Sequence, residues 1–213
     1  MKDCTEIVFV LDESGSMDTI RTDVIGGFNS FVADQKALPG EAYLTLVKFS
    51  SYGNMQTVFE HVSIAEVKDL TFGSYTPGGM TALLQAMHVT IDNVGKRLSD
   101  LTEDERPNKV IMVIMTDGEE NNSGNKYSKK TISEKITHQS EVYKWEFLFP
   151  GANQDAIAEG ASMGIDGAKS LTYQASARGT KAMYSTISNA VSSYRTTGDT
   201  GNLTEEYTKN LVD

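Results

Sequence analysis

Apolar residues along this chain form short continuous runs that alternate with longer stretches of helical spacing. Residues 5–11 are mostly β-branched or aromatic, and residues 110–115 are apolar at every position. A strand covered on both faces by helices has this composition. Between such runs, residues 20–37 place apolar side chains at helical spacing, which predicts an amphipathic helix. Strands that alternate with helices predict an α/β fold with a mostly parallel sheet.

Two strands early in the chain depart from this alternation. Glu41–Phe49 and Met55–Ser63 are joined only by residues 50–54. A parallel crossover needs a dozen or more residues, so this short link predicts an antiparallel pair. We therefore expect one antiparallel strand at an edge of the sheet.

The remaining segments continue the alternation. A loop rich in Gly, Pro and Thr at 71–80 opens into a helix with the apolar stripe Leu83, Met87, Ile91, Val94 and Leu98. The other predicted elements are a helical turn at 66–70, helices at Lys129–Tyr143, 155–163 and 175–194, strands at 145–149 and 169–173, a turn at 196–202 and a helical segment at 205–212. Together they predict a three-layer, doubly wound, six-stranded sheet with helices on both faces. One domain covers residues 1–195, and residues 196–213 form an extension that packs on it or trails from it.

Composition narrows the classes of partner. The 213 residues include 19 basic and 29 acidic side chains, which gives a formal net charge of −10. Such a surface repels nucleic acids and anionic membranes, and no long run of Lys and Arg offsets it. No stretch approaches the roughly 20 apolar residues that span a bilayer, and we expect no signal peptide before the first strand. The single cysteine, Cys4, is expected to be buried in that strand, and the composition suits a cytoplasmic protein.

Two carboxylates follow strands whose carboxyl ends are expected at one edge of the sheet. Asp12 closes the first strand, and Asp117 closes the all-apolar strand. In a doubly wound sheet these strands are neighbours where the strand order reverses, and ligands bind at that point. The loop that precedes Thr81 starts a helix at the same edge. We therefore expect the three segments to converge.

Hydroxyl groups accompany the two carboxylates. Asp12, Ser14 and Ser16 alternate along a turn that Gly15 permits, so that all three project into one volume. Thr81 adds a third hydroxyl. Hard oxygen ligands with few formal charges suit Mg²⁺, with Mn²⁺ or Ca²⁺ as alternatives. These oxygens leave a coordination position for an outside ligand, for which the carboxylate of a Glu or Asp in a partner protein is the natural candidate.

Each residue of this set also has an ordinary structural role. Asp12, Ser14 or Ser16 alone could cap the first helix, Thr81 could cap the next one, and Asp117 could open a turn. Their joint occurrence at one predicted edge favours the metal site.

Other residues near this edge are interpreted without a direct role in metal binding. Glu13, Glu119 and Glu120 are interpreted as solvated charges, and Tyr75 either packs or contacts a partner. A zinc site is not expected, because no His-Glu-x-x-His spacing is present. The three histidines are scattered at His61, His88 and His138.

Three separated motifs support the metal site. They are Asp12-x-Ser14-x-Ser16, the loop Gly78-Gly79-Met80-Thr81, and Thr116-Asp117-Gly118. In sequence and order they resemble the metal-ion-dependent adhesion site (MIDAS) of von Willebrand factor type A (vWA) domains, over residues 5–194. This resemblance implies a mostly parallel six-stranded sheet, with the serines and the threonine at the metal and the aspartates often acting through water. It also implies a protein-binding module that is not an enzyme.

A narrower resemblance concerns residues 117–121 and 149–156. These segments are similar to stand-alone bacterial and phage members of the family, which implies a location in the cytoplasm of a bacterium or of a phage-infected host.

The alternative function is a metal-assisted phosphatase or phosphotransferase that uses Asp12 as the nucleophile. Phosphatases of the haloacid dehalogenase type carry a second Asp two residues later, where this chain has Ser14. No lysine is evidently placed to steady a phosphoryl group, and only Lys109 is left open for that role. No phosphate-binding loop, dinucleotide fingerprint or nucleophile elbow is present, so we expect no enzyme activity.

Overall fold

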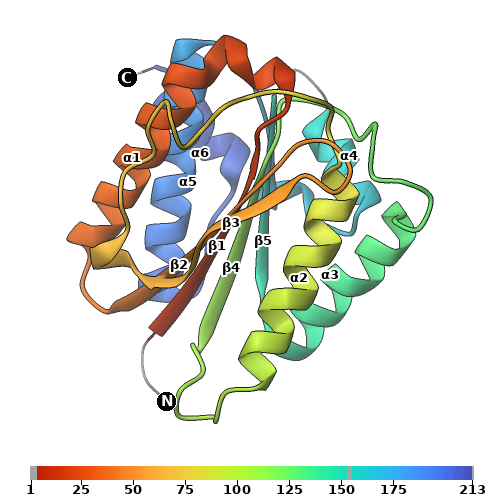
Figure 1. Cartoon of the computed structure of the whole chain (residues 1–213). Helices are drawn as coiled ribbons and strands as arrows, with labels where there is room; N and C mark the ends of the chain where they lie inside the picture. Colours follow the sequence, from red (N-terminus) through yellow and green to blue (C-terminus); the bar gives the residue numbers. More distant parts are fainter. Residues whose placement is uncertain (1–3, 153–154, 213) are drawn as a thin grey trace.

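A central sheet of six strands lies between two layers of helices in the computed structural model, which describes residues 4–152 and 155–212 (Figure 1). The strand order is β3-β2-β1-β4-β5-β6, and only the β2–β3 pair is antiparallel. This architecture confirms the predicted fold, including the antiparallel edge strand. The strands are β1 (Cys4–Asp12), β2 (Glu41–Phe49), β3 (Met55–Ser63), β4 (Lys109–Met115), β5 (Glu146–Ala152) and β6 (Ser170–Tyr173).

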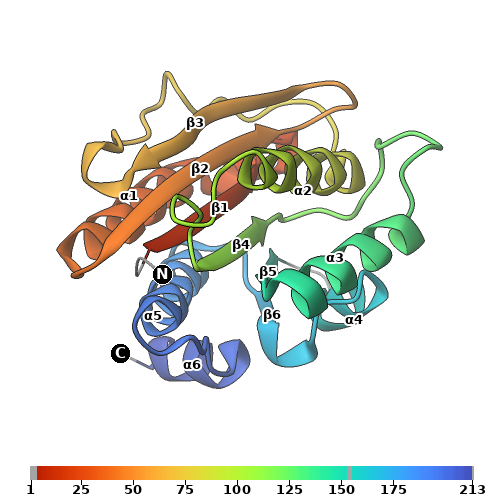
Figure 2. The same cartoon turned by 90° about the horizontal axis from the view of Figure 1, so that it is seen from below.

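The helices divide between the two faces of the sheet (Figure 2). One face is covered by α1 (Arg21–Ala37), α5 (Ala177–Thr197) and α6 (Leu203–Asn210). The other is covered by α2 (Leu83–Ser99), α3 (Lys129–Tyr143) and α4 (Ala156–Ser162). Alternate residues of β1 serve the two cores: Phe9 packs with α1 and α5, and Val10 packs with α2.

Strands β1 and β4 are parallel neighbours at the centre of the sheet. Leu11 pairs with Met115, so the residues that follow both strands emerge at the same edge. A short 3₁₀ helix, η1 (Gly15–Ile20), leads from β1 into α1 at this edge. The predicted switch point is therefore present where Asp12 and Asp117 lie.

The prediction of a helical turn at 66–70 is wrong. The helical turn is η2 (Ile64–Glu66), and the chain after it is irregular. The side chain of Asn29 explains this path, because its amide donates to the Leu70 carbonyl oxygen at 3.0 Å while its oxygen accepts from the Leu70 nitrogen at 2.8 Å. Contacts with α1 thus replace local helical hydrogen bonds.

The end of the chain packs on the domain. Leu203 and Tyr207 of α6 belong to the same buried cluster as Phe9. A second short 3₁₀ helix, η3 (Gly167–Lys169), lies earlier in the chain, just before β6. The division of the chain at 195 and 196 stays a prediction.

Cys4 is buried in β1, as expected. Among the described residues, no helix combines the length and apolar character needed to cross a bilayer.

Candidate metal centre

Oxygen atoms from three chain segments meet where β1 and β4 end. The hydroxyl oxygens of Ser14 and Ser16 are 3.2 Å apart, and Ser16 donates a 2.6 Å hydrogen bond to Oδ1 of Asp117. The hydroxyl of Thr81 adjoins Gly118, where an added Cβ would lie 3.2 Å from Thr81 Oγ1 and 3.9 Å from Ser16 Oγ. The structure therefore brings the serines, Thr81 and Asp117 to one place, and the glycine leaves room for their oxygens.

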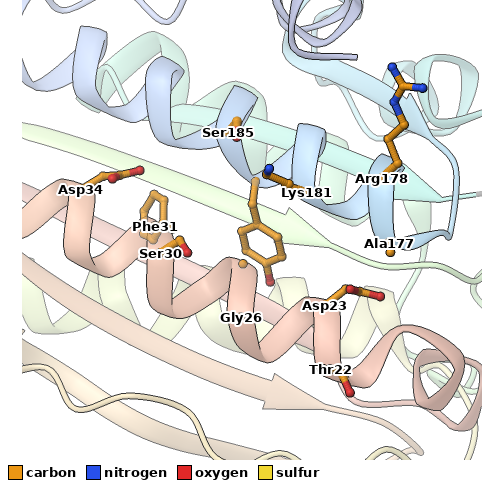
Figure 3. Close-up of a pocket in the computed structure, with 12 residues that line it drawn as sticks. Thr22, Asp23, Gly26, Ser30, Phe31, Asp34, Ala177, Arg178, Lys181 and Ser185 are labelled. Carbon is orange, nitrogen blue, oxygen red and sulfur yellow. The ribbon is translucent and has the colours of Figure 1, made fainter. Parts of the chain in front are cut away.

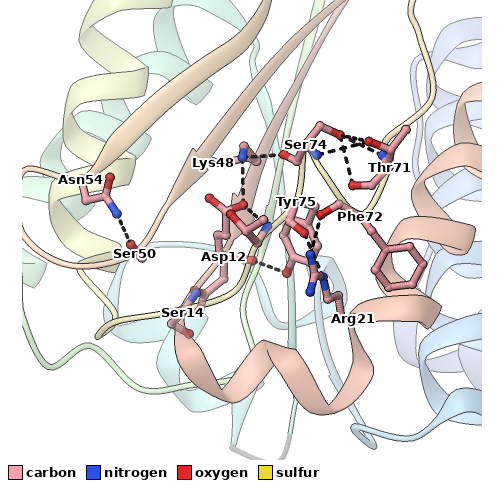
Figure 4. Close-up of polar contacts among 12 residues, drawn as sticks. Asp12, Ser14, Arg21, Lys48, Ser50, Asn54, Thr71, Phe72, Ser74 and Tyr75 are labelled. Carbon is pink, nitrogen blue, oxygen red and sulfur yellow. Dashed lines mark hydrogen bonds and ion pairs between the residues drawn. The ribbon is translucent and has the colours of Figure 1, made fainter.

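Asp12 lies beneath this group and is fully buried. Its Oδ1 accepts a 2.7 Å hydrogen bond from the main-chain nitrogen of Ser14, and its Oδ2 accepts one of 2.6 Å from Thr116 Oγ1. Figure 4 shows Asp12 and Ser14 at the start of the turn that leads to α1. Asp12 thus fixes the backbone of the serine turn and contributes negative charge from below.

Burial makes both carboxylates costly as anions. Desolvation raises the pKa of Asp12 from 3.8 to about 6, and the charge of Asp117 adds to this effect. Desolvation also raises the pKa of Asp117, against the lowering effect of its hydrogen bond from Ser16. Two neighbouring acids with raised pKa values are a site where a cation would be favourable. The donor set of hydroxyl and carboxylate oxygens fits a hard divalent ion.

Helix capping does not account for the hydroxyl groups. Ser14 holds the N-cap position of η1, yet its side chain makes no capping hydrogen bond. The N-cap of α2 is Ala82 instead of Thr81. Two residues from the loop after β4 accept hydrogen bonds from main-chain nitrogens at the start of α2. Glu120 accepts from the Leu84 nitrogen, and the hydroxyl oxygen of Ser123 accepts from the Gln85 nitrogen.

The glycine-rich loop is joined to the serine turn through main-chain atoms. The Gly15 nitrogen donates to the Gly79 oxygen at 3.0 Å, and the Gly78 nitrogen donates to the Glu13 oxygen at 2.8 Å. Gly79 has a φ of +81°, and an added Cβ would lie 2.5 Å from Ser51 Oγ. A side chain at this position is therefore excluded, and the close approach keeps Thr81 beside the serines.

The interpretation of Glu13 as a solvated charge is wrong. Its Oε1 accepts hydrogen bonds from Lys48 Nζ at 2.8 Å and from the Thr76 nitrogen at 2.6 Å. Lys48 is buried and also donates to the Ser74 oxygen. Because β2 lies beside β1, the lysine at the end of β2 reaches the glutamate, and the pair ties the 71–79 loop to the site.

Glu120 is also wrongly interpreted as a solvated charge. Its carboxylate accepts from the main-chain nitrogens of Leu84, Asn122 and Ser123, and from the Ser123 hydroxyl. Glu119 is exposed, in agreement with its interpretation. The neighbouring Asn121, which sequence reasoning missed, accepts a hydrogen bond from the Thr81 nitrogen at 2.9 Å. No sequence signal marks this contact, which joins residues 40 positions apart.

Tyr75 packs inside the protein. It is fully buried, and its hydroxyl donates a 2.7 Å hydrogen bond to the main-chain oxygen of Asp12. Arg21 at the start of α1 donates to the main-chain oxygens of Tyr75 and Phe72 and lies over the Phe72 ring (Figure 4). Of the two roles considered for Tyr75, the structure supports packing.

The residues considered for phosphoryl transfer are not arranged for it. Lys109 starts β4 at the opposite end of the strand from Asp117, and its Nζ donates to the Arg195 oxygen. Asp12 ends β1 at the other edge of the sheet, so Lys109 and Asp12 do not meet at one site.

Other parts of the surface are separate from this centre. A groove of about 550 Å³ lies between α1 and α5, and its lining includes Asp23 and Asp34 on α1 and Arg178 and Lys181 on α5 (Figure 3). None of the five predicted metal ligands lines it. Within residues 4–152 and 155–212, no three His, Cys, Asp or Glu side chains are grouped as a metal site.

Comparison with known proteins agrees with this fold. The family model of the von Willebrand factor type A domain matches residues 6–154. The chain belongs to this family. No match of this vWA domain to a curated protein sequence is significant.

Solved structures similar to this vWA domain come from several different organisms. Proximal thread matrix protein 1 from the mussel byssus is 15% identical, with a TM-score of 0.63 over 89% of this chain and 49% of that chain. The pilus adhesin SpaC from Lactobacillus rhamnosus GG is 14% identical, with a TM-score of 0.64 over 88% of this chain and 30% of that chain. The ArnB paralog VWA2 from Sulfolobus acidocaldarius is 17% identical, with a TM-score of 0.53 over 89% and 45%. The chain thus spans half or less of these proteins, and the likeness concerns the fold.

Proposed function

We propose that this vWA domain binds a divalent cation through Asp12, Ser14, Ser16, Thr81 and Asp117 and uses it to hold an acidic side chain of a partner protein. The observation that carries this proposal is the contact between Ser16 and Asp117, which joins the ends of β1 and β4 through a 2.6 Å hydrogen bond. Three hydroxyls and two desolvated carboxylates then share one small volume. The bound ion would offset the carboxylate charge and accept one further carboxylate ligand.

The donor chemistry supports Mg²⁺ as the ion, with Mn²⁺ in its place. Three of the five donors are neutral hydroxyls, so the site carries two negative charges at most, and an added carboxylate from a partner would keep the total moderate. One structure of the mussel protein, with a TM-score of 0.61 and 15% identity to this chain, has zinc in its MIDAS motif. That relative supports a divalent ion at this position of the fold.

The partner is proposed to be a protein. A hard cation in this site favours a carboxylate as its outside ligand, and Glu and Asp side chains supply carboxylates. The similar SpaC structure is a pilus adhesin. For this chain, with its net charge of −10, we propose an intracellular role in a bacterium or a phage-infected cell, as a protein-binding module of the stand-alone type. Neither nucleic acid nor a membrane fits this charge.

A metal titration tests the proposal. Saturating Mg²⁺ or Mn²⁺ at about 100 times its Kd should stabilise the wild type by about 2.7 kcal/mol, a rise in Tm of roughly 5–10 °C. Asp12→Asn and Ser16→Ala should lose this rise, and Ser162→Ala, on α4 away from the site, should keep it. Equal shifts in all four proteins would place the ion elsewhere, and no shift in the wild type would remove the proposal. Calorimetric titration with Mn²⁺ gives the stoichiometry, expected to be one.

A further inference from the structure

A polar trough of about 760 Å³ lies beside the candidate metal centre. Its walls are the β2–β3 link and the loop between β4 and α3. Five of its lining side chains, together called the Asn-Tyr trough, are Tyr52, Asn121, Asn122, Asn125 and Tyr127. None of them is among the proposed metal ligands.

The Asn-Tyr trough is continuous with the metal centre. Asn121 accepts a hydrogen bond from the Thr81 nitrogen at 2.9 Å through its side chain, and its own nitrogen donates to the Thr81 oxygen at 3.0 Å. Met80, next to Thr81, is 48% exposed, and its nitrogen donates to Ser51 Oγ beside Tyr52. A chain that placed one side chain at Thr81 would therefore enter the trough with its next residues.

The walls of the trough are held in place by hydrogen bonds. The Tyr52 nitrogen donates to Asn122 Oδ1 at 2.6 Å, and the Gly53 nitrogen donates to Gln85 Oε1 at 2.8 Å. Gly124 has a φ of +76°, and an added Cβ would lie 3.0 Å from the Tyr52 ring. Tyr52 is nevertheless 51% exposed, so an aromatic surface is fixed at the wall without being covered.

The trough offers hydrogen-bond donors from its asparagine side chains. The side-chain oxygens of Asn121 and Asn122 are used within the protein, whereas their amide nitrogens have no partner among the residues that the structure describes. The carboxylate of Glu120 accepts four hydrogen bonds and is not available. Amide donors match the carbonyl groups of an extended peptide.

We infer that the Asn-Tyr trough binds an extended peptide segment of the partner, immediately beside the acidic residue held at the metal centre. The segment has an apolar or aromatic residue next to its Glu or Asp, because Met80 and Tyr52 lie exposed at the junction. The carbonyl oxygens of its further residues accept hydrogen bonds from the asparagine amides. This inference rests on the proposed function, since the metal fixes one end of the segment.

A displayed peptide library tests the inference with the wild-type chain. Twelve-residue random peptides with a fixed central Glu are selected in Mg²⁺, beside a matched library with Gln in its place. Enriched peptides should require Glu and Mg²⁺ and should share an apolar or aromatic residue on one side of the Glu. Tyr52→Ala and Asn125→Ala should each weaken binding of the best peptide at least tenfold, while Mn²⁺ affinity and Tm stay unchanged. The control is Tyr143→Ala, an exposed tyrosine at the end of α3, which should leave peptide affinity unchanged.

The outcomes separate the inference from the proposed function. If wild type binds Mn²⁺ and Glu peptides but Tyr52→Ala and Asn125→Ala bind them equally well, the inference is overturned and the metal function stands. The same holds if Mn²⁺ binds and no peptide is enriched, or if a glycan array gives ligands that depend on Tyr52. If wild type binds no Mn²⁺, the proposed function fails and the inference fails with it.

Discussion

The hydroxyl of Tyr75 donates a 2.7 Å hydrogen bond to the main-chain oxygen of Asp12, a residue 63 positions earlier. Both residues are fully buried, so this contact fixes the end of β1 from the loop that leads to α2. The orientation of the serine turn therefore depends on a residue that contributes no atom to the candidate metal centre.

Tyr75→Phe should lower the free energy of unfolding by about 1–3 kcal/mol, because the Asp12 oxygen loses its buried donor. Mn²⁺ affinity should fall as well, since the serine turn is less firmly held. Tyr173→Phe is a matched control, because the Tyr173 hydroxyl is buried without a hydrogen-bond partner among the described residues. In urea unfolding, the Tyr173→Phe control should be as stable as wild type or more stable. An equal loss of unfolding free energy in both variants would contradict this account.

Glu120→Gln should lower the free energy of unfolding by about 1–3 kcal/mol, because an amide cannot accept on both sides as the carboxylate does. The start of α2 would lose its acceptor at the Leu84 nitrogen. Glu119→Gln, at the exposed neighbouring position, should change stability by less than about 0.5 kcal/mol. Thermal unfolding of the two variants measures the difference, and similar Tm values would show that the Glu120 contacts contribute little.

Two adjacent glycines of α1 should respond in opposite directions to alanine. Gly26 has open space around an added Cβ, so Gly26→Ala should stabilise by up to about 1 kcal/mol through helix propensity. At Gly27 the added Cβ would lie 2.1 Å from the Tyr184 ring, which stacks on Phe9. Gly27→Ala should therefore destabilise by about 1–3 kcal/mol. Urea unfolding measures both effects. If the urea midpoints of the two variants shifted in the same direction relative to wild type, this packing explanation would be ruled out.

Tyr194 should make stability sensitive to alkaline pH. Burial raises its pKa from 10.0 to about 12, and its hydroxyl donates to the main-chain oxygens of Val110 and Lys144. The folded state keeps the proton longer than the unfolded state, so this contribution is complete below pH 10 and is lost between pH 10 and 12. Tyr194→Phe should cost about 0.5–1.5 kcal/mol at pH 7. The difference from wild type should shrink as the pH rises through that window, and a constant difference would exclude this linkage.

The sheet could be predicted because each strand is marked by a pattern within a short segment of the sequence. The link at 50–54 is too short for a crossover, so it predicted an antiparallel pair, and the apolar run at 110–115 is typical of a strand covered on both faces. The expected neighbourhood of the strands at 5–11 and 110–115 then placed Asp12 and Asp117 at one edge, where the structure has them. The helical turn expected at 66–70 failed because Asn29, which fixes Leu70, lies 41 positions away.

The supports of the site escaped prediction for a similar reason. Glu13 was interpreted as a solvated charge, yet Lys48, 35 positions later, pairs with it in the folded chain. The role of Glu120 depends on nitrogens of α2, and that of Tyr75 on its complete burial. Such roles arise when elements pack against one another, and neither residue type nor spacing reveals them. Candidate ligands could be named because turn motifs carry them, whereas their positioning partners have no motif.

The burial of Cys4 in β1 supplies an intrinsic reporter of breathing in the central strand. With a single thiol in the chain, buried at the far end of β1 from Asp12, a thiol reagent should react faster when the start of that strand opens. The alkylation rate then measures the opening equilibrium of the strand to which the serine turn is attached, in unmodified protein. Ligands that stabilise one end of β1 become detectable as slower labelling at the other.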